Sequence, residues 1–215
     1  MNFEEKLGKK LKYLVFYPKN IDANKEYNVV FFMHGYGDSM NGISGVIEYL
    51  SKDNVYIFLN APFELIFNSI QTGYYWYQFP LENFDEFAVS QNYINESIDE
   101  FLEDASFKIK NIFLGGFSQG GIMTLHNNFR GKINGLFIIG SRMYQELENE
   151  IFINNNTKIF LSHGTNDEVL NIEEGRKIKS FIETKNLTLD YHEYNIGHQI
   201  IPDQMFELNK WIGQI

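Results

Sequence analysis

Short apolar runs recur along the chain and predict the strands of a central β-sheet. They are rich in β-branched and aromatic side chains, which favour strands. The central runs are apolar without alternation, as expected for strands buried on both faces of a parallel sheet, whereas the first and last contain more polar residues and suit sheet edges. The seven predicted strands are residues 14–17, 29–34, 55–60, 111–116, 135–140, 158–164 and 189–194.

Four of the segments between or after these runs have the spacing of amphipathic helices. The predicted helices are residues 86–103, 120–129, 173–182 and 202–212. The alternation of strands and helices predicts an α/β fold with a mainly parallel central sheet of about seven strands, helices on both faces and right-handed crossovers. Since the sequence shows no internal repeat and no linker, we expect one domain over residues 1–215.

Residues 61–80, APFELIFNSIQTGYYWYQFP, show neither the apolar pattern of a strand nor the spacing of an amphipathic helix. They are rich in aromatic side chains. Long irregular loops in compact domains are often functional lids or binding loops. The alternative is that the tyrosine and tryptophan rings simply pack over the sheet. The sequence leaves both interpretations open.

Composition narrows the classes of function. The formal net charge is −10 and the pI is about 5.0, which argues against a nucleic-acid or anionic-membrane partner. The chain has no cysteine, so a covalent nucleophile has to be serine, threonine, lysine or a carboxylate. We find no signal peptide and no apolar run near the ~18 residues of a membrane span, and therefore expect a cytoplasmic protein without stable membrane insertion.

The pentapeptide from Gly116 to Gly120, GFSQG, fits the G-x-S-x-G pattern. The pattern alone arises by chance in roughly one chain in fifteen of this length. Here a predicted strand precedes it and a predicted helix follows, so Ser118 is expected on the sharp turn called a nucleophile elbow. A phosphate-binding loop is the rival interpretation, but no lysine follows the glycines. Ser118 is therefore the candidate nucleophile.

A serine hydroxyl needs a base to take its proton and an acid to orient that base. Asp167 follows the strand at 158–164, and His198 follows the strand at 189–194, so both lie at carboxyl ends of strands. The order Ser, Asp, His is the one typical of α/β-hydrolases. Glu168 is the alternative acid, and we favour Asp167.

Acyl transfer also requires hydrogen-bond donors for the oxyanion. One candidate is the backbone N–H of Gln119, the residue after the nucleophile. The other is the backbone N–H of Tyr36 in the sequence HGYGD, which follows the strand at 29–34. Small residues in this sequence allow a backbone amide to face the site.

The motifs GFSQGG, HGYGD, HGTNDEVL and GHQI, in this order, resemble those of the phospholipase/carboxylesterase group of α/β-hydrolases, which includes acyl-protein thioesterases. The similarity runs from about Leu14 to Trp211. It implies the same triad and oxyanion amides, no large cap domain, and hydrolysis of carboxylic esters or thioesters without cofactor or metal. Two departures stand near the expected acyl groove: Gln78 replaces an acid in YWYQF, and the loop after the fifth predicted strand reads GSRMYQE.

The sequence thus predicts a serine hydrolase that cleaves esters or thioesters with an apolar acyl group through an acyl-enzyme intermediate. Trp76 and Tyr77, in the aromatic segment, are candidate substrate-binding residues. The expected partners are small or lipid-like esters and thioesters, with acylated proteins and a second copy of the chain as further candidates. A serine peptidase on the same scaffold is the alternative enzyme class, and a non-catalytic binding protein is the third interpretation.

Overall fold

The computed structural model describes residues 3–129 and 131–215. Its centre is an eight-stranded sheet in the order β1-β2-β4-β3-β7-β8-β9-β10. β1 and β2 run antiparallel to their neighbours, and all other pairs are parallel. The strands are β1 Phe3–Leu7, β2 Lys12–Phe16, β3 Glu26–Met33, β4 Val55–Leu59, β7 Lys108–Phe117, β8 Gly135–Ile139, β9 Lys158–Gly164 and β10 Leu189–Tyr194.

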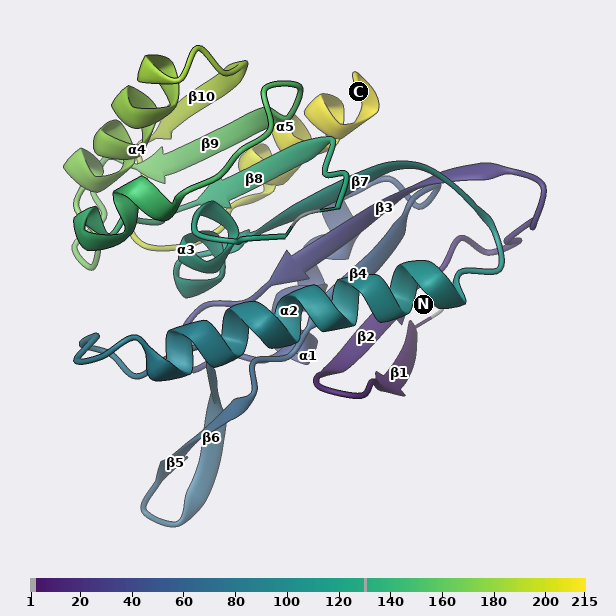
Figure 1. Cartoon of the computed structure of the whole chain (residues 1–215), viewed down its shortest axis with the longest axis horizontal. Helices are drawn as coiled ribbons and strands as arrows, with labels where there is room; N and C mark the ends of the chain where they lie inside the picture. The colour runs from purple at the N-terminus through teal and green to yellow at the C-terminus, as the bar shows by residue number, and fades with distance from the viewer. Residues whose placement is uncertain (1–2, 130) are drawn as a thin grey trace.

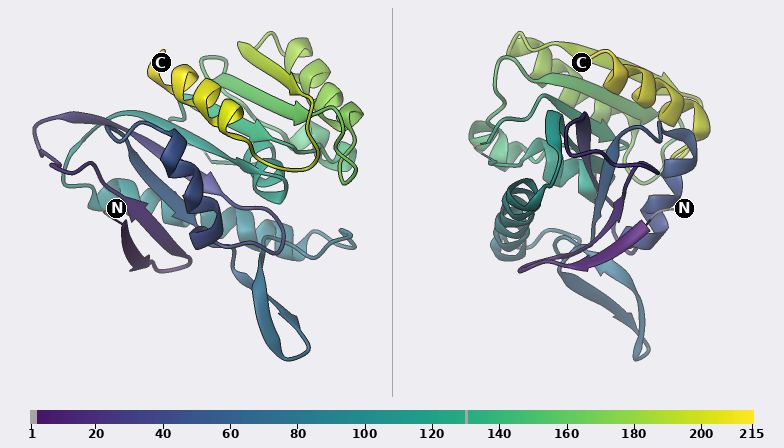
Figure 2. Two further views of the ribbon diagram at one scale, coloured as in Figure 1. Left: turned by 180° about the vertical axis from the view of Figure 1, so that it is seen from behind. Right: turned by 90° about the vertical axis from the view of Figure 1, so that its right-hand side faces the viewer.

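Helices cover both faces of this sheet (Figures 1 and 2). α2, α3 and α4 pack on one face, and α1, the adjoining η1 and α5 pack on the other. Successive residues of β3 alternate between these two apolar layers, because side chains of a strand point to opposite faces. The helical elements are α1 Met40–Ile43, η1 Ser44–Tyr49, α2 Asp85–Asp104, α3 Gln119–Leu125, η2 Gln145–Glu150, α4 Ile172–Thr184 and α5 Pro202–Gly213.

The structure confirms the α/β fold, the mainly parallel sheet and all seven predicted strands. The sequence missed β1, because its residues FEEKL are mostly polar and half-buried or exposed at the edge of the sheet. The four predicted helices are present, although α3 ends at Leu125, before the predicted end at 129. Within the described residues, no separate cap domain covers the sheet. None of the helices they form is both long and apolar enough to cross a membrane.

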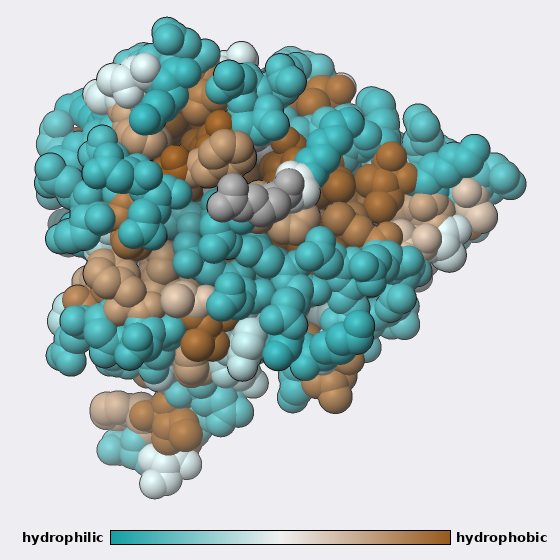
Figure 3. All heavy atoms as spheres, viewed as in Figure 1, coloured by the Kyte–Doolittle hydropathy of each residue, from teal (hydrophilic) through white to brown (hydrophobic). Residues whose placement is uncertain are grey.

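The aromatic segment at 61–80 is more regular than predicted. It contains an antiparallel hairpin of β5 Phe63–Phe67 and β6 Ile70–Tyr75, which projects from the body of the molecule (Figure 1). Asn68 and Ser69 form the turn with φ of 50° and 63°, as expected for a tight hairpin turn. Apolar side chains are exposed near the tip, as Figure 3 shows; they are Ile66, Phe67 and Ile70.

Candidate active site

Ser118 lies at the sharp turn between β7 and α3. Its φ of 52° and ψ of −116° lie outside the helix and strand regions, a strained conformation typical of a nucleophile elbow. The Ser118 N–H donates to Ile139 O at 2.9 Å, which ties the turn to β8. A Cβ atom on Gly120 would lie 2.3 Å from Met33 O, so the turn requires glycine there. The strand–serine–helix arrangement predicted from GFSQG is confirmed.

Ser118, His198 and Asp167 come from three different strand ends and form one hydrogen-bonded row. His198 Nε2 lies 2.9 Å from Ser118 Oγ, and His198 Nδ1 lies 2.6 Å from Asp167 Oδ2. When Nδ1 carries the proton and donates to the carboxylate, Nε2 is free to accept the proton of the serine hydroxyl. The His198 ring also packs on the Phe117 ring, with centroids 4.8 Å apart. The row therefore has the geometry needed to activate a serine.

Asp167 is held in place by its own local turn. Its Oδ1 accepts hydrogen bonds from the backbone N–H groups of Val169 at 2.9 Å and Leu170 at 2.8 Å. The residue is buried, and its Oδ2 remains for His198. Glu168, the alternative acid, is exposed. The geometry therefore favours Asp167 over Glu168 as the partner of the imidazole.

The two amides predicted to stabilise an oxyanion belong to the two segments next to Ser118, which are α3 and the loop after β3. Gln119 is the first residue of α3, so its N–H has no acceptor within the helix. Tyr36 lies in the loop after β3, and this loop lies against the elbow: a Cβ on Gly35 would be 3.3 Å from Ser118 Cβ. In the part of the chain that the structure describes, neither amide donates to an acceptor. Both are available to a ligand, and their catalytic role stays a prediction.

His34 supports the loop after β3 from inside the core. Its Nε2 accepts from Ala61 N–H at 3.0 Å, and its Nδ1–H donates to Gly35 O at 2.7 Å. Burial lowers the pKa of His34 to about 4, so the ring is neutral near pH 7 and can make both bonds. β6 holds the loop from the other side, where Gly37 N–H donates to Tyr74 O at 2.8 Å.

The side chain of Gln119 has a role that the sequence did not indicate. Its Oε1 accepts from Trp76 N–H at 2.9 Å, and its Nε2 donates to Tyr77 O at 2.7 Å. The Trp76 indole N–H donates to His34 O at 2.9 Å, and the Ser90 hydroxyl donates to Trp76 O. Gln119 thus links the elbow to the segment after β6. A glutamine at the buried start of a helix needs hydrogen-bond partners for its side chain. This requirement is the signal that could have predicted a link from Gln119 to another segment.

A cavity of about 280 Å³ opens beside Ser118 and His198. Both Tyr77 and Trp76 are fully buried, but only Tyr77 is one of the lining residues. The expectation that Trp76 contacts substrate is corrected accordingly, because its ring packs beside His34 inside the core. The remaining lining residues, most of them missed by sequence reasoning, are Gly35, Tyr36, Asp38, Phe79, Phe117, Gln119, Ile122, Arg142, Val169, Leu170.

The cavity is suited to an apolar group held next to a reactive hydroxyl. Most of its lining side chains are aromatic or aliphatic, and the acidic and basic ones besides His198 are Asp38 and Arg142. Burial raises the pKa of Asp38 above its usual range. Among the described residues, no group of three or more histidine or acidic side chains is arranged to hold a metal ion.

The chain is similar to known proteins over most of its length. A profile of the phospholipase/carboxylesterase family matches residues 20–215. The acyl-protein thioesterase 1 of Emericella nidulans is 29% identical, over 92% of this chain and 95% of that protein. The acyl-protein thioesterase 1 of Kluyveromyces lactis is 31% identical, over 79% of this chain and 82% of that protein.

Solved structures share the fold at lower identity. The Bacillus cereus carboxylesterase has a TM-score of 0.76 at 19% identity and covers 96% of this chain and 95% of its own. The Zea mays acyl-protein thioesterase 2 has a TM-score of 0.73 at 18% identity and covers 94% of this chain and 97% of its own. These likenesses extend over nearly the whole chain.

Proposed function

Since this chain belongs to the phospholipase/carboxylesterase family and is an ester or thioester hydrolase, we propose that Ser118, His198 and Asp167 carry out its reaction through an acyl-enzyme intermediate. The observation that carries this proposal is the hydrogen-bonded row of the three side chains at the mouth of an apolar cavity. The nucleophile, its base and the group that orients the base are within hydrogen-bond reach of one another, as covalent catalysis by serine requires.

The first half of the reaction forms the acyl-enzyme. Ser118 Oγ attacks the carbonyl carbon of the substrate while His198 Nε2 takes the hydroxyl proton. The resulting tetrahedral oxyanion accepts hydrogen bonds from the N–H groups of Tyr36 and Gln119. The bond to the leaving oxygen or sulfur then breaks, and the imidazolium gives its proton to that atom. The product alcohol or thiol leaves, and the acyl group remains on the serine.

The second half repeats these steps with water. His198 takes a proton from the water as its oxygen attacks the acyl carbon, and the proton is returned to Ser118 Oγ as the acid is released. Asp167 keeps Nδ1 protonated and stabilises the imidazolium that forms in each half. The oxyanion donors act where charge develops, and the loss of one such donor costs about a hundredfold to a thousandfold in rate.

The cavity indicates the kind of acyl group. Its volume of about 280 Å³ lies near the lower end of small-molecule sites, which run from roughly 300 to 1,000 Å³. Its aromatic and aliphatic lining suits a short or medium hydrocarbon chain. Relatives named acyl-protein thioesterases support acylated proteins as one substrate class, with small lipid-like esters as the other. A cytoplasmic location belongs to the same proposal and is supported by the net charge of −10.

Fluorophosphonate labelling tests the nucleophile directly, because the probe reacts only with an activated serine. Wild-type protein should label and Ser118→Ala should not; equal labelling of both proteins contradicts the assignment.

His198→Ala tests the base and should lower p-nitrophenyl ester turnover about ten-thousandfold, because triad members act as a unit. His192, which lies 2.9 Å from Asp190 on β10, gives a matched control, and His192→Ala should retain turnover. Faster cleavage of aminoacyl anilides than of esters would instead indicate a peptidase.

A further inference from the structure

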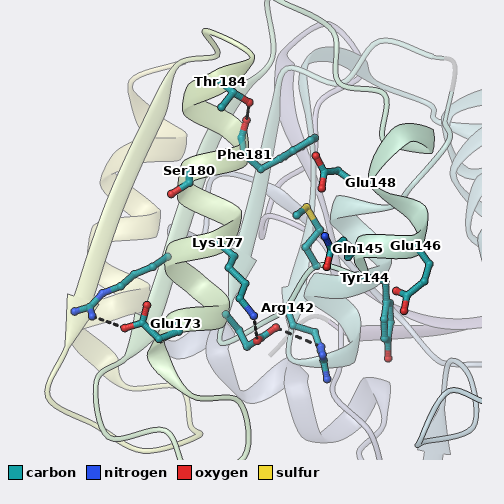
Figure 4. Close-up of a pocket in the computed structure, with 13 residues that line it drawn as sticks. Arg142, Tyr144, Gln145, Glu146, Glu148, Glu173, Lys177, Ser180, Phe181 and Thr184 are labelled. Carbon is teal, nitrogen blue, oxygen red and sulfur yellow. Dashed lines mark hydrogen bonds and ion pairs between the residues drawn. The ribbon is translucent and has the colours of Figure 1, made fainter.

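Arg142 lies where two cavities meet. It follows the end of β8 and lines the 280 Å³ cavity beside Ser118. It also lines an outer cavity of about 710 Å³, whose walls are the segment after β8, including η2, and helix α4 (Figure 4). The outer cavity is charged, whereas the inner one is mainly apolar. Arg142 therefore places a cation at the boundary between a hydrocarbon-binding space and a polar one.

The guanidinium of Arg142 has unused hydrogen-bonding capacity. Lys177 Nζ lies 2.7 Å from Glu174 Oε1, and Arg176 donates to carboxylates on two sides. Arg142 approaches only the second oxygen of Glu174, with Nε at 3.5 Å, so the Glu174 carboxylate is shared between Arg142 and Lys177. Within the described residues, the guanidinium makes no hydrogen bond, and its Nε is buried. A buried donor without a hydrogen bond is costly, so a ligand that supplies an acceptor to the guanidinium is favoured.

The position of Arg142 is fixed by its neighbours. Its Cζ lies 5.3 Å from the centre of the Tyr144 ring, a cation–π contact. Tyr144 in turn donates its hydroxyl proton to the hydroxyl of Tyr77 at 3.1 Å. On the other side, the Ser141 hydroxyl donates to the backbone oxygen of Ser118 at 3.1 Å. The guanidinium is thus held in a defined place close to the elbow, which reduces the entropy lost on binding.

The order of the strands separates Arg142 from the acidic residue of the inner cavity. Asp38 follows β3 and Arg142 follows β8, while Ser118 follows β7, which lies between these two strands. The two charges therefore flank the nucleophile from opposite sides. An anionic group bound on the β8 side of Ser118 therefore lies nearer to Arg142 than to Asp38.

We propose that Arg142 binds an anionic group, a carboxylate or phosphate, that the substrate carries at one end of an apolar stretch. This inference rests on the proposed function and deepens it, because it names the charge of the preferred ester. Arginine binds such groups with two parallel hydrogen bonds, and the apolar inner cavity strengthens the attraction. Glu174 competes with the ligand for the guanidinium, so its removal should strengthen binding.

The anion can stand on the acyl group or on the leaving group, and two ester pairs distinguish these sources. For the acyl side, the p-nitrophenyl monoester of adipic acid is compared with p-nitrophenyl hexanoate. For the leaving-group side, the butanoate of m-hydroxybenzoate is compared with that of m-hydroxybenzamide. The readout is the ratio of kcat/KM for the anionic to the neutral member of each pair, measured in the wild type, Arg142→Gln, Arg176→Gln and Glu174→Gln.

In one of the two pairs, Arg142→Gln should lower this ratio about tenfold to a hundredfold, the range expected for a lost charge-assisted hydrogen bond. Arg176→Gln makes the same change in net charge and should keep the wild-type ratio. Glu174→Gln should raise it, and this variant decides the question where Arg142→Gln does not fold. If the kcat/KM ratios are unchanged in Arg142→Gln, or fall equally in Arg176→Gln, the inference about Arg142 is wrong. The proposed hydrolase function is not affected by that outcome. A wild type that cleaves none of the four esters overturns the proposed function as well.

Discussion

Replacing Gln119 by methionine tests the link between the elbow and the segment after β6. Methionine has a similar volume but can neither accept from Trp76 N–H nor donate to Tyr77 O. Both backbone groups belong to residues without solvent exposure, and each unsatisfied group costs roughly 1–3 kcal/mol. The free energy of unfolding should therefore fall by about 2–6 kcal/mol. For a chain of this size, each kcal/mol corresponds to roughly 2–4 °C in Tm.

The same variant should also lose activity, although the backbone N–H of residue 119 remains. Tyr77 lines the inner cavity, and Trp76 donates a hydrogen bond to the oxygen of His34 at the start of the loop after β3. A small displacement of these groups should lower kcat/KM for a p-nitrophenyl ester between tenfold and a hundredfold. Stability is measured by urea unfolding and activity by initial rates at a temperature where the variant is folded.

Gln71 provides the matched control, because it is exposed on β6 of the projecting hairpin. Gln71→Met should change the unfolding free energy by no more than about 0.5 kcal/mol. The reasoning is refuted if Gln119→Met unfolds at the wild-type urea concentration, since the two hydrogen bonds would then contribute nothing. An equal loss in Gln71→Met would assign the effect to the exchange of glutamine for methionine.

Three further changes have defined outcomes. Asp167→Asn should lower kcat about ten-thousandfold while retaining fluorophosphonate labelling at a reduced rate, because an amide favours the wrong tautomer of His198; wild-type kcat would contradict this role. Gly120→Ala should prevent folding or lower Tm by more than about 10 °C, because the Cβ of the alanine would lie 2.3 Å from Met33 O. A wild-type melting curve would show instead that the elbow can shift. His34 has a pKa of about 4 when folded against 6.5 when unfolded, so its contribution to stability is fully present above pH 6.5 and falls by about 3 kcal/mol as the pH drops toward 4. Urea unfolding at pH 7.5 and 5 in wild type and His34→Gln measures the part of that loss that has occurred by pH 5, about 2 kcal/mol, which should be smaller in the variant.

The positions of the candidate triad could be predicted because apolar runs mark where strands end. Ser118, Asp167 and His198 each follow such a run, and parallel strands bring their carboxyl ends to one edge of a sheet. The sequence could not show the side-chain contacts made by irregular segments, which have neither a strand pattern nor helical spacing. Arg142 lies in such a segment, and its contacts with Tyr144 and Glu174 depend on how the segment after β8 lies against α4.

The aromatic segment shows a second limit of pattern reasoning. Trp76 and Tyr77 are adjacent and equally apolar, yet only Tyr77 reaches the inner cavity. Both residues lie in the bend after β6, so neither strand alternation nor helical spacing assigns the direction of their side chains. The hairpin before them was missed for a related reason: most of its β5 and β6 residues are exposed or half-buried, which removes the alternation that marks a strand packed on a core.

The hairpin also has a practical use in experiments on this chain. Its base is joined to the loop after β3 by the bridge between Asp38 and Tyr74, while its turn at Asn68 and Ser69 lies at the far end of both strands. The chain contains no cysteine, so a single cysteine introduced at this turn would be the unique thiol of the protein. A maleimide dye or spin label attached there would report on the hairpin while leaving the hydroxyl of Ser118 free for its own probe.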